Sequence, residues 1–273
     1  MNVSFALLLA TLAGLSTGIG SLIGLWACRP RCAHLAIILG FSAGVMVYIS
    51  FVELLATAVT RIGVINANIA FFVGIGFIAG LDLLIPHTYK EERIKGMNQP
   101  RDNAAALRRS ESLEPAFTPG RSEALKRAGV LTALGIAIHN FPEGLVVFSS
   151  GISGDRSLGI VVAIAISLHN IPEGLSVFVP VFEATQSKKQ AFFYSFSAGV
   201  AEPVGALLGY AILAPFLTPS LVPALLAFAG GIMVYISLDE LLPAAHEYGE
   251  AHLTIVGVAA GMIVMAATLV LLD

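Results

Sequence analysis

One hexapeptide occurs twice in the sequence, as His139–Gly144 (HNFPEG) and, thirty residues later, as His169–Gly174 (HNIPEG). Each copy places a histidine and a glutamate four residues apart, so both side chains lie on one face if the segment is helical. Imidazole and carboxylate groups together are suitable ligands for divalent transition metals. Both copies lie within apolar stretches, where ionisable groups are costly and usually functional. The repeated motif therefore predicts a metal site in an apolar environment.

A third acid, Glu202, lies in another apolar run and is followed by Pro203. Because proline lacks an amide hydrogen, we expect Pro142, Pro172 and Pro203 to break their helices and free backbone carbonyls near the site. The proposed ligand cluster consists of His139, Asn140, Glu143, His169, Asn170, Glu173 and Glu202. Three carboxylates at low dielectric cannot all stay ionised without a cation, since repulsion and desolvation favour their protonated forms. Metal binding should therefore displace protons.

The cluster holds more candidate ligands than the four that tetrahedral zinc requires. Two adjacent metal positions that share Glu143 and Glu173 would use all of them, and so would one site that exchanges ligands between conformations. The alternative is that the histidines and asparagines only tie helices together by hydrogen bonds. Because acidic side chains inside a membrane are energetically costly, the presence of two motif copies together with Glu202 argues against that alternative.

The elements that carry these residues are indicated by composition: 56% of the residues are hydrophobic and 12% are charged, against about a quarter charged in soluble domains. Apolar runs of about twenty residues, the length that crosses a bilayer as a helix, recur along the chain. We expect an all-α integral membrane protein with a single transmembrane domain, 1–273. Its eight spans are predicted at 4–27, 33–58, 63–86, 126–150, 157–182, 189–213, 219–245 and 252–272.

The polar segment 87–122 is predicted to be a flexible cytoplasmic loop, because it has too few apolar residues to build a core. If the N-terminus is outside, the connections on the inner side hold 13 of the 15 Lys and Arg residues, and only Arg61 and Arg156 lie on the outer side. The positive-inside rule then places both termini on the extracytoplasmic side of the cell inner membrane.

A second repeat matches Phe41–Ala58 to Phe228–Ala245 without a gap, with Met, Tyr, Ser and Glu in register. The copies lie in spans two and seven, which cross in opposite directions. We therefore expect a 3+2+3 arrangement, with spans 1–3 and 6–8 as inverted repeats around the central pair, 4 and 5. Inverted repeats place binding sites near the midplane and allow alternating access. In span one, the stretch corresponding to Glu202, near Leu15–Thr17, has no carboxylate.

The second repeat also places acids toward each mouth of the site, and these could form an entry and exit path. Glu53 would lie toward the outside and could collect a cation, while Asp239 and Glu240 on the inner side could receive it. Alternatively, these are interfacial acids that pack against serine or backbone donors. Met46 and Ser50 share a helical face with Glu53 and could either line the path or pack. The candidate path residues are Met46, Ser50, Glu53, Asp239, Glu240 and His246.

The two hexapeptides, Glu202 and the GxMxxxSxxEL repeat resemble the ZIP (Zrt-, Irt-like) family of metal transporters, in particular its bacterial branch. The resemblance covers essentially the whole chain. It implies eight helices in a 3+2+3 arrangement, uptake of divalent metal into the cytoplasm, a binuclear metal centre and a homodimer. Similar members hold one metal with the residues that correspond to His139, Glu143, His169 and Glu173. The adjacent position would use Asn140, Glu143, Asn170, Glu173 and Glu202.

Some relatives have Gln and Asp where this chain has His169 and Asn170, a difference that bears on metal preference. We expect a secondary transporter that imports Zn²⁺, with Fe²⁺, Mn²⁺, Co²⁺ or Cd²⁺ as further substrates. The sequence has no G-x-x-x-x-G-K-[ST] motif, which argues against ATP as the energy source, and we expect no nucleotide or nucleic-acid partner. The alternative is an intramembrane zinc-dependent hydrolase, but the H-E-x-x-H motif is absent.

Overall fold

The computed structural model describes residues 3–27, 32–84, 137–138, 140–213, 218, 220–248 and 251–272. All regular secondary structure within these residues is helical, as predicted. The α-helices are α1 (Val3–Ala27), α2 (Cys32–Ile49), α3 (Ala56–Ile62), α4 (Val64–Leu84), α8 (Arg156–Thr185), α9 (Lys188–Leu213), α10 (Leu221–Ile236), α11 (Leu242–Tyr248) and α12 (Ala251–Leu272). Two π-helical turns, η1 (Ser50–Leu55) and η3 (Ser237–Leu241), join α2 to α3 and α10 to α11. A further helical segment covers 140–152.

Seven helical segments of the described residues are long and apolar enough to cross a membrane: Val3–Trp26, Ala33–Ile62, Val64–Leu81, Arg156–Val179, Lys188–Ile212, Leu221–His246 and Ala251–Leu271. They match seven of the eight predicted spans. The eighth, 126–150, is described only at 137–138 and from residue 140 onward, and it is helical there. The predicted loop at 87–122 lies outside the described residues.

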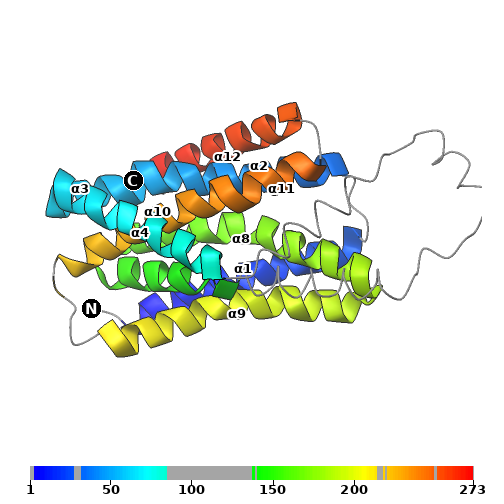
Figure 1. Ribbon diagram of the computed structural model, residues 1–273. Coiled ribbons are helices and arrows are strands. Elements are labelled where there is room, and N and C mark those ends of the chain that lie inside the picture. The colour runs from blue at the N-terminus through cyan, green and yellow to red at the C-terminus, as the bar shows by residue number, and fades with distance from the viewer. Residues whose placement is uncertain are drawn as a thin grey trace, which may run out of the picture.

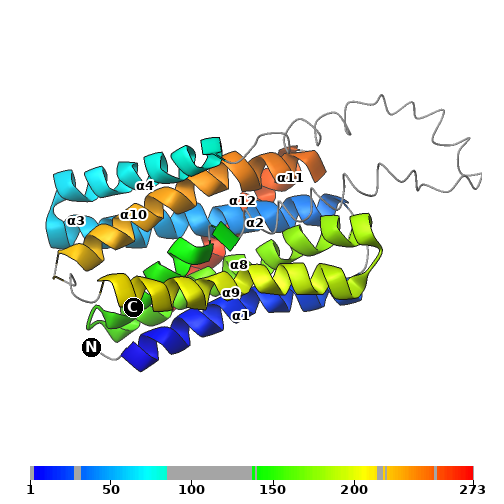
Figure 2. The ribbon, with the colours of Figure 1, turned by 60° about the horizontal axis from the view of Figure 1, so that its bottom comes forward.

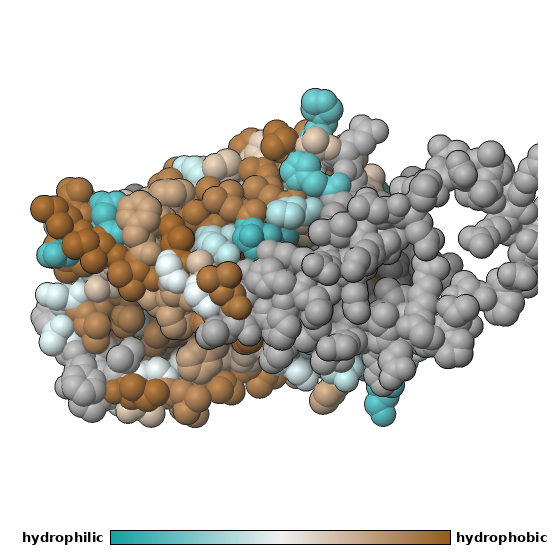
Figure 3. All heavy atoms as spheres, in the orientation of Figure 1, coloured by the Kyte–Doolittle hydropathy of each residue, from teal (hydrophilic) through white to brown (hydrophobic). Residues whose placement is uncertain are grey.

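Large apolar side chains are exposed along the outer helices, as expected of a surface that contacts lipid. Hydrophobic residues cover most of the coloured surface in Figure 3. On α4 and α12 the exposed apolar residues include Ile65, Phe72, Val73, Ile255, Ile263 and Leu271.

The helices form two groups that meet at α8. In Figures 1 and 2, α1, α8 and α9 lie on one side of the molecule, and α2, α4 and α10–α12 lie on the other. Helix α8 packs against α1 and α9 within its own group and against α2 across the boundary. The first turn of α1 and the last turn of α12 lie at the same end of the molecule (Figure 1).

Close glycine contacts repeat between the two halves of the chain. At each of four glycines, an added Cβ would lie closer than 3.0 Å to a backbone carbonyl oxygen of the neighbouring helix. The pairs of glycine and carbonyl residue are Gly44 with Val258, Gly231 with Phe71, Gly74 with Phe228, and Gly261 with Phe41. The offset in sequence between Phe41 and Phe228 also relates these contacts to one another. The contact of Gly44 with Val258 corresponds to that of Gly231 with Phe71, and the contact of Gly74 with Phe228 corresponds to that of Gly261 with Phe41. Helices α2 and α12 therefore pack as α10 and α4 do.

Both copies of this repeat contain a π-helical turn at the same place. Ser50 donates a hydrogen bond from Oγ to the carbonyl oxygen of Met46 at 2.6 Å, and Ser237 donates one to that of Met233 at 2.7 Å. Glu53 lies in the first turn of η1. The repeat pattern alone did not predict a π-helix in either copy. Because such turns insert one extra residue, they change the direction in which the following side chains point.

Contrary to the prediction, Pro172 and Pro203 do not break their helices. Helix α8 runs continuously through Pro172, and α9 runs continuously through Pro203. Pro142 lies in the helical segment that covers 140–152, and residue 139 before that segment lies outside the described residues. A proline removes only one amide donor, and packed neighbours can hold a membrane helix together around it. The predicted break is therefore wrong for Pro172 and Pro203.

Replacement of Gly74 by alanine should destabilise the protein by about 1–3 kcal/mol, because the new methyl group would collide with the carbonyl oxygen of Phe228. The matched control is Gly76→Ala on the same helix, where an added Cβ would meet nothing within 4 Å. Thermal unfolding of the purified protein in detergent should show a lower midpoint for Gly74→Ala only. Equal midpoints for the two variants would contradict the close packing of α4 on α10.

Candidate metal centre

A short hairpin makes the helices that carry the two hexapeptides antiparallel. The helical segment covering 140–152 turns back at Ser153–Asp155, where Gly154 has a φ of 91°. The Asp155 carboxylate then caps α8 by accepting hydrogen bonds from the amides of Ser157 at 3.0 Å and Leu158 at 3.2 Å. At a rise of about 1.5 Å per residue, Glu143 lies about 16 Å from Gly154 along its helix, and His169 lies about 22 Å from it. The hairpin therefore brings Glu143 close to the start of the second motif on the antiparallel helix.

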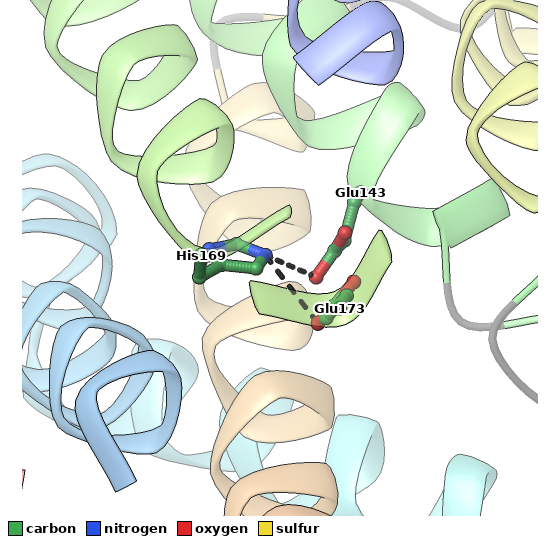
Figure 4. A group of neighbouring side chains, drawn as sticks. All are labelled: Glu143, His169 and Glu173. Atoms are coloured by element: carbon green, nitrogen blue, oxygen red, sulfur yellow. Dashed lines mark hydrogen bonds and ion pairs between the residues drawn. The ribbon is translucent and has the colours of Figure 1, made fainter. Parts of the chain in front are cut away.

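The described part of the two motifs forms a compact group of three ligands. Each of Glu143, His169 and Glu173 offers one ligand atom, and these atoms lie within 4.8 Å of one another. His169 Nε2 is 3.0 Å from Glu143 Oε1 and 4.0 Å from Glu173 Oε1. Figure 4 shows the imidazole pointing toward both carboxylates, with His169 and Glu173 on α8. All three residues are at most 1% exposed.

The second nitrogen of the imidazole fixes the orientation of the ring. His169 Nδ1 lies 3.2 Å from the carbonyl oxygen of Ala165, which can only accept a hydrogen bond. With its proton on Nδ1, a neutral imidazole presents the lone pair of Nε2 to Glu143, which is also an acceptor. Such a contact is stable only when a proton or a metal ion lies between the two atoms. Metal-binding histidines commonly donate their other N–H in this way.

A serine of α2 fixes the backbone at this histidine. Ser42 donates a hydrogen bond from Oγ to the carbonyl oxygen of His169 at 3.3 Å, and Ser42 is fully buried. This contact joins the two helix groups next to the ligand group. Sequence reasoning did not find Ser42, because a serine in an apolar span has no local signal of a partner on another helix.

The two asparagines use their amide nitrogens to bind other helices. Asn170 Nδ2 donates to Glu202 Oε1 and to the carbonyl oxygen of Ala13, both at 3.0 Å. Asn140 Nδ2 donates to the carbonyl oxygen of Ala198 at 3.1 Å. Within the described part of the chain, the amide oxygens of both asparagines are buried and accept no hydrogen bond. Since an unsatisfied buried acceptor is unfavourable, these oxygens are suitable ligands for a cation.

The charge of the centre requires compensation. Glu143, Glu173 and Glu202 are buried, and no lysine or arginine is buried among the residues that the structure describes. Glu202 lies beside the first motif, since an added Cβ at Gly144 would collide with its carbonyl oxygen. Isolated carboxylates are strongly disfavoured at low dielectric. Protons or bound cations must therefore neutralise this region.

His139, the remaining predicted ligand, lies outside the described residues. The candidate path residues do not join the group of three ligands. Met46 of α2 and Ser50 at the start of η1 are fully buried, as Ser42 is. Glu53 is half-buried and accepts a hydrogen bond from Thr57 Oγ1 at 3.2 Å.

At the other end of the predicted path, Asp239 is half-buried in η3, and Glu240 and His246 are exposed. His246 Nδ1 lies 2.7 Å from the carbonyl oxygen of Leu242. The six path residues are therefore distributed along α2, η1, η3 and α11. Their part in metal movement stays a prediction.

A third repeat, of which sequence reasoning found only the stretch near Leu15–Thr17, underlies the contacts of the asparagines. Ala13–Gly24 of α1 (AGLSTGIGSLIG) matches Ala198–Gly209 of α9 (AGVAEPVGALLG), so the acceptors Ala13 and Ala198 are equivalent. The shared pattern AGxxxxxGxLxG could have revealed this relation. Its small residues also allow close helix packing.

Comparison with known proteins shows the family of this chain. A family model described as ZIP Zinc transporter matches residues 87–269. The zinc transporter ZupT of Nitratidesulfovibrio vulgaris is 50% identical over 278 residues, which cover 99% of this chain and 98% of the relative. The zinc transporter ZupT of Clostridium perfringens is 46% identical over 278 residues, covering 99% and 96%. This chain belongs to the ZIP zinc transporter family.

Proposed function

We propose that this protein is a secondary transporter that imports Zn²⁺ into the cytoplasm through the buried His, Asn and Glu centre. The observation that carries the proposal is the convergence of His169, Glu143 and Glu173 in an apolar bundle. The relatives are named zinc transporters, which favours transport over the hydrolase alternative. No observation on the described residues favours the hydrolase.

The proposed ligands are sufficient to bind two adjacent cations. We infer that one is held by His139, Glu143, His169 and Glu173. The second would use Asn140, Glu143, Asn170, Glu173 and Glu202. The hydrogen bond from Asn170 to Glu202 and the two buried asparagine oxygens support a second position on the oxygen-rich side. Shared carboxylates would couple the two positions, because each cation stabilises the ionised form that the other also needs.

The ligand chemistry also suits Fe²⁺, Mn²⁺, Co²⁺ and Cd²⁺ as further substrates. Imidazole and carboxylate accept several divalent transition metals, and no thiolate is among the proposed ligands. The cation itself is the cargo, so its affinity must be high enough for capture and low enough for release. The energy would come from the gradient of the metal or of protons, or from the membrane potential.

The repeated contacts support the 3+2+3 arrangement in the membrane. Helices α2 and α4 pack on α12 and α10 through equivalent glycines, and α1 and α9 carry equivalent acceptors for the two asparagines. We infer that the chain lies in the cell inner membrane with both termini outside, as the distribution of Lys and Arg suggests. A homodimer and a cytoplasmic loop at 87–122 are further parts of the proposal.

Glu143→Gln and Glu173→Gln should each reduce zinc uptake by at least about tenfold, because each removes a charged ligand from the centre. The measurement is uptake of radiolabelled zinc into proteoliposomes, with the amount of inserted protein determined in parallel. His252→Gln is the control, since His252 is an exposed residue of α12. Normal uptake by either glutamine variant would remove the central assignment.

His169→Gln and Asn170→Asp should change the relative uptake of zinc, iron and manganese more than the total activity. Replacing imidazole by an amide, or an amide by a carboxylate, changes the ligand type and charge that select among these ions. Competitive uptake across a metal panel measures this selectivity. An unchanged metal profile would show that these two positions do not set it.

Glu240→Gln should slow the delivery of zinc to the vesicle interior more than it weakens binding at the centre, because Glu240 is exposed on η3 and not among the central ligands. Uptake rates in proteoliposomes and equilibrium zinc binding in detergent give the two quantities. Equal losses of rate and affinity would contradict an exit role for Glu240.

A further inference from the structure

Helices α1 and α9 contact the two central motifs in the same way. Asn170 binds the carbonyl oxygen of Ala13 on α1, and Asn140 binds that of Ala198 on α9. The closing glycines of the motifs also match. An added Cβ at Gly174 would collide with the carbonyl oxygen of Thr17, and one at Gly144 with that of Glu202. In this internal symmetry, Thr17 occupies the position of Glu202.

The side chains of these two residues also occupy equivalent places. An added Cβ at Gly14 of α1 would lie 3.1 Å from Cβ of Glu202. An added Cβ at Gly199 of α9 would lie 2.8 Å from Cβ of Thr17 and 3.0 Å from its Oγ1. The hydroxyl group of Thr17 therefore lies against α9 at the residue that follows Ala198, the acceptor of Asn140.

The hydroxyl group of Thr17 has an unusual environment. Thr17 is fully buried, and its Oγ1 makes no hydrogen bond within the described part of the chain. A helical threonine normally donates to the carbonyl four residues earlier. Here that carbonyl, of Ala13, already accepts from Ser16 Oγ at 2.6 Å and from Asn170 Nδ2 at 3.0 Å. A valine would fit this place without an unsatisfied hydroxyl group, so the oxygen needs another explanation.

We propose that Thr17 Oγ1 is a further oxygen ligand of the transported cation, directly or through one water molecule, on the Asn140 side of the centre. It mirrors Glu202 on the Asn170 side, and the inference rests on the proposed zinc transport. A neutral hydroxyl group binds a divalent cation more weakly than a carboxylate, since affinity rises with ligand charge. The oxygen-rich position then has a carboxylate on one side and a neutral hydroxyl group on the other, so Thr17 adds a ligand atom without adding charge.

The test is equilibrium Zn²⁺ binding to the full-length protein purified in detergent, with the affinity and the number of bound ions measured for each variant. Thr17→Val removes the oxygen and should raise the Kd of the Zn²⁺ in the oxygen-rich position by about tenfold, the lower end of what loss of a supporting group costs a metal site. Thr17→Ser keeps the oxygen and should restore most of the affinity. Thr254→Val is the matched control, because Thr254 on α12 is also fully buried with no hydrogen bond from Oγ1 among the described residues, but it packs on α2 at Gly40.

Loss of affinity in Thr17→Val alone, with Thr17→Ser and Thr254→Val close to wild type, would support the inference. Unchanged binding by Thr17→Val would overturn it, and so would an equal loss in Thr254→Val, which would indicate a general packing effect. If Thr17→Val does not fold, the comparison of Thr17→Ala with Thr17→Ser isolates the same oxygen, and equal affinities would overturn the inference. A wild-type protein that binds no Zn²⁺ would overturn the proposed function itself, whereas a wild type that binds Zn²⁺ with unchanged Thr17 variants overturns only the assignment of Thr17.

Discussion

Glu143, Glu173 and Glu202 lie inside a helical bundle in which, among the described residues, no lysine or arginine is buried. Their negative charge is stable there only when protons or metal ions neutralise it. The imidazole of His169 faces Glu143 as a second acceptor when its Nδ1 proton lies at the carbonyl oxygen of Ala165, so this pair has the same requirement. A site that must exchange protons and cations to remain stable is well suited to moving cations.

Close backbone contacts bring these groups together. The glycines of both hexapeptides let α1 and α9 approach so closely that any side chain would collide with a carbonyl oxygen. Carbonyls of the same helices accept the amide protons of Asn140 and Asn170, which leaves the asparagine oxygens to a ligand. Packing and ligand geometry are therefore set by the same contacts, and small residues at helix interfaces allow both.

The internal symmetry is close in the backbone and incomplete in the chemistry. The acceptors of the asparagines, the glycine contacts and the π-helical turns all occur twice, in equivalent places. Glu202 has Thr17 as its counterpart, and the first half of the chain thus lacks one carboxylate. A symmetric scaffold offers two related conformations, and a carboxylate on one side with a hydroxyl group on the other makes the charge around a bound cation uneven.

The sequence by itself determined the helical class, the seven membrane-spanning segments that the structure describes and the pairing of the two hexapeptides, because hydropathy and residue spacing are local properties of the chain. It wrongly predicted breaks at Pro172 and Pro203, since the loss of one amide donor depends on whether neighbouring helices support the segment. Only the tertiary structure decided that Ser42 holds the backbone of His169, that Asn170 reaches Glu202, and that Thr17 lies against Gly199 of α9. Each of these contacts joins residues far apart in the chain, and their partners depend on which helix faces pack together.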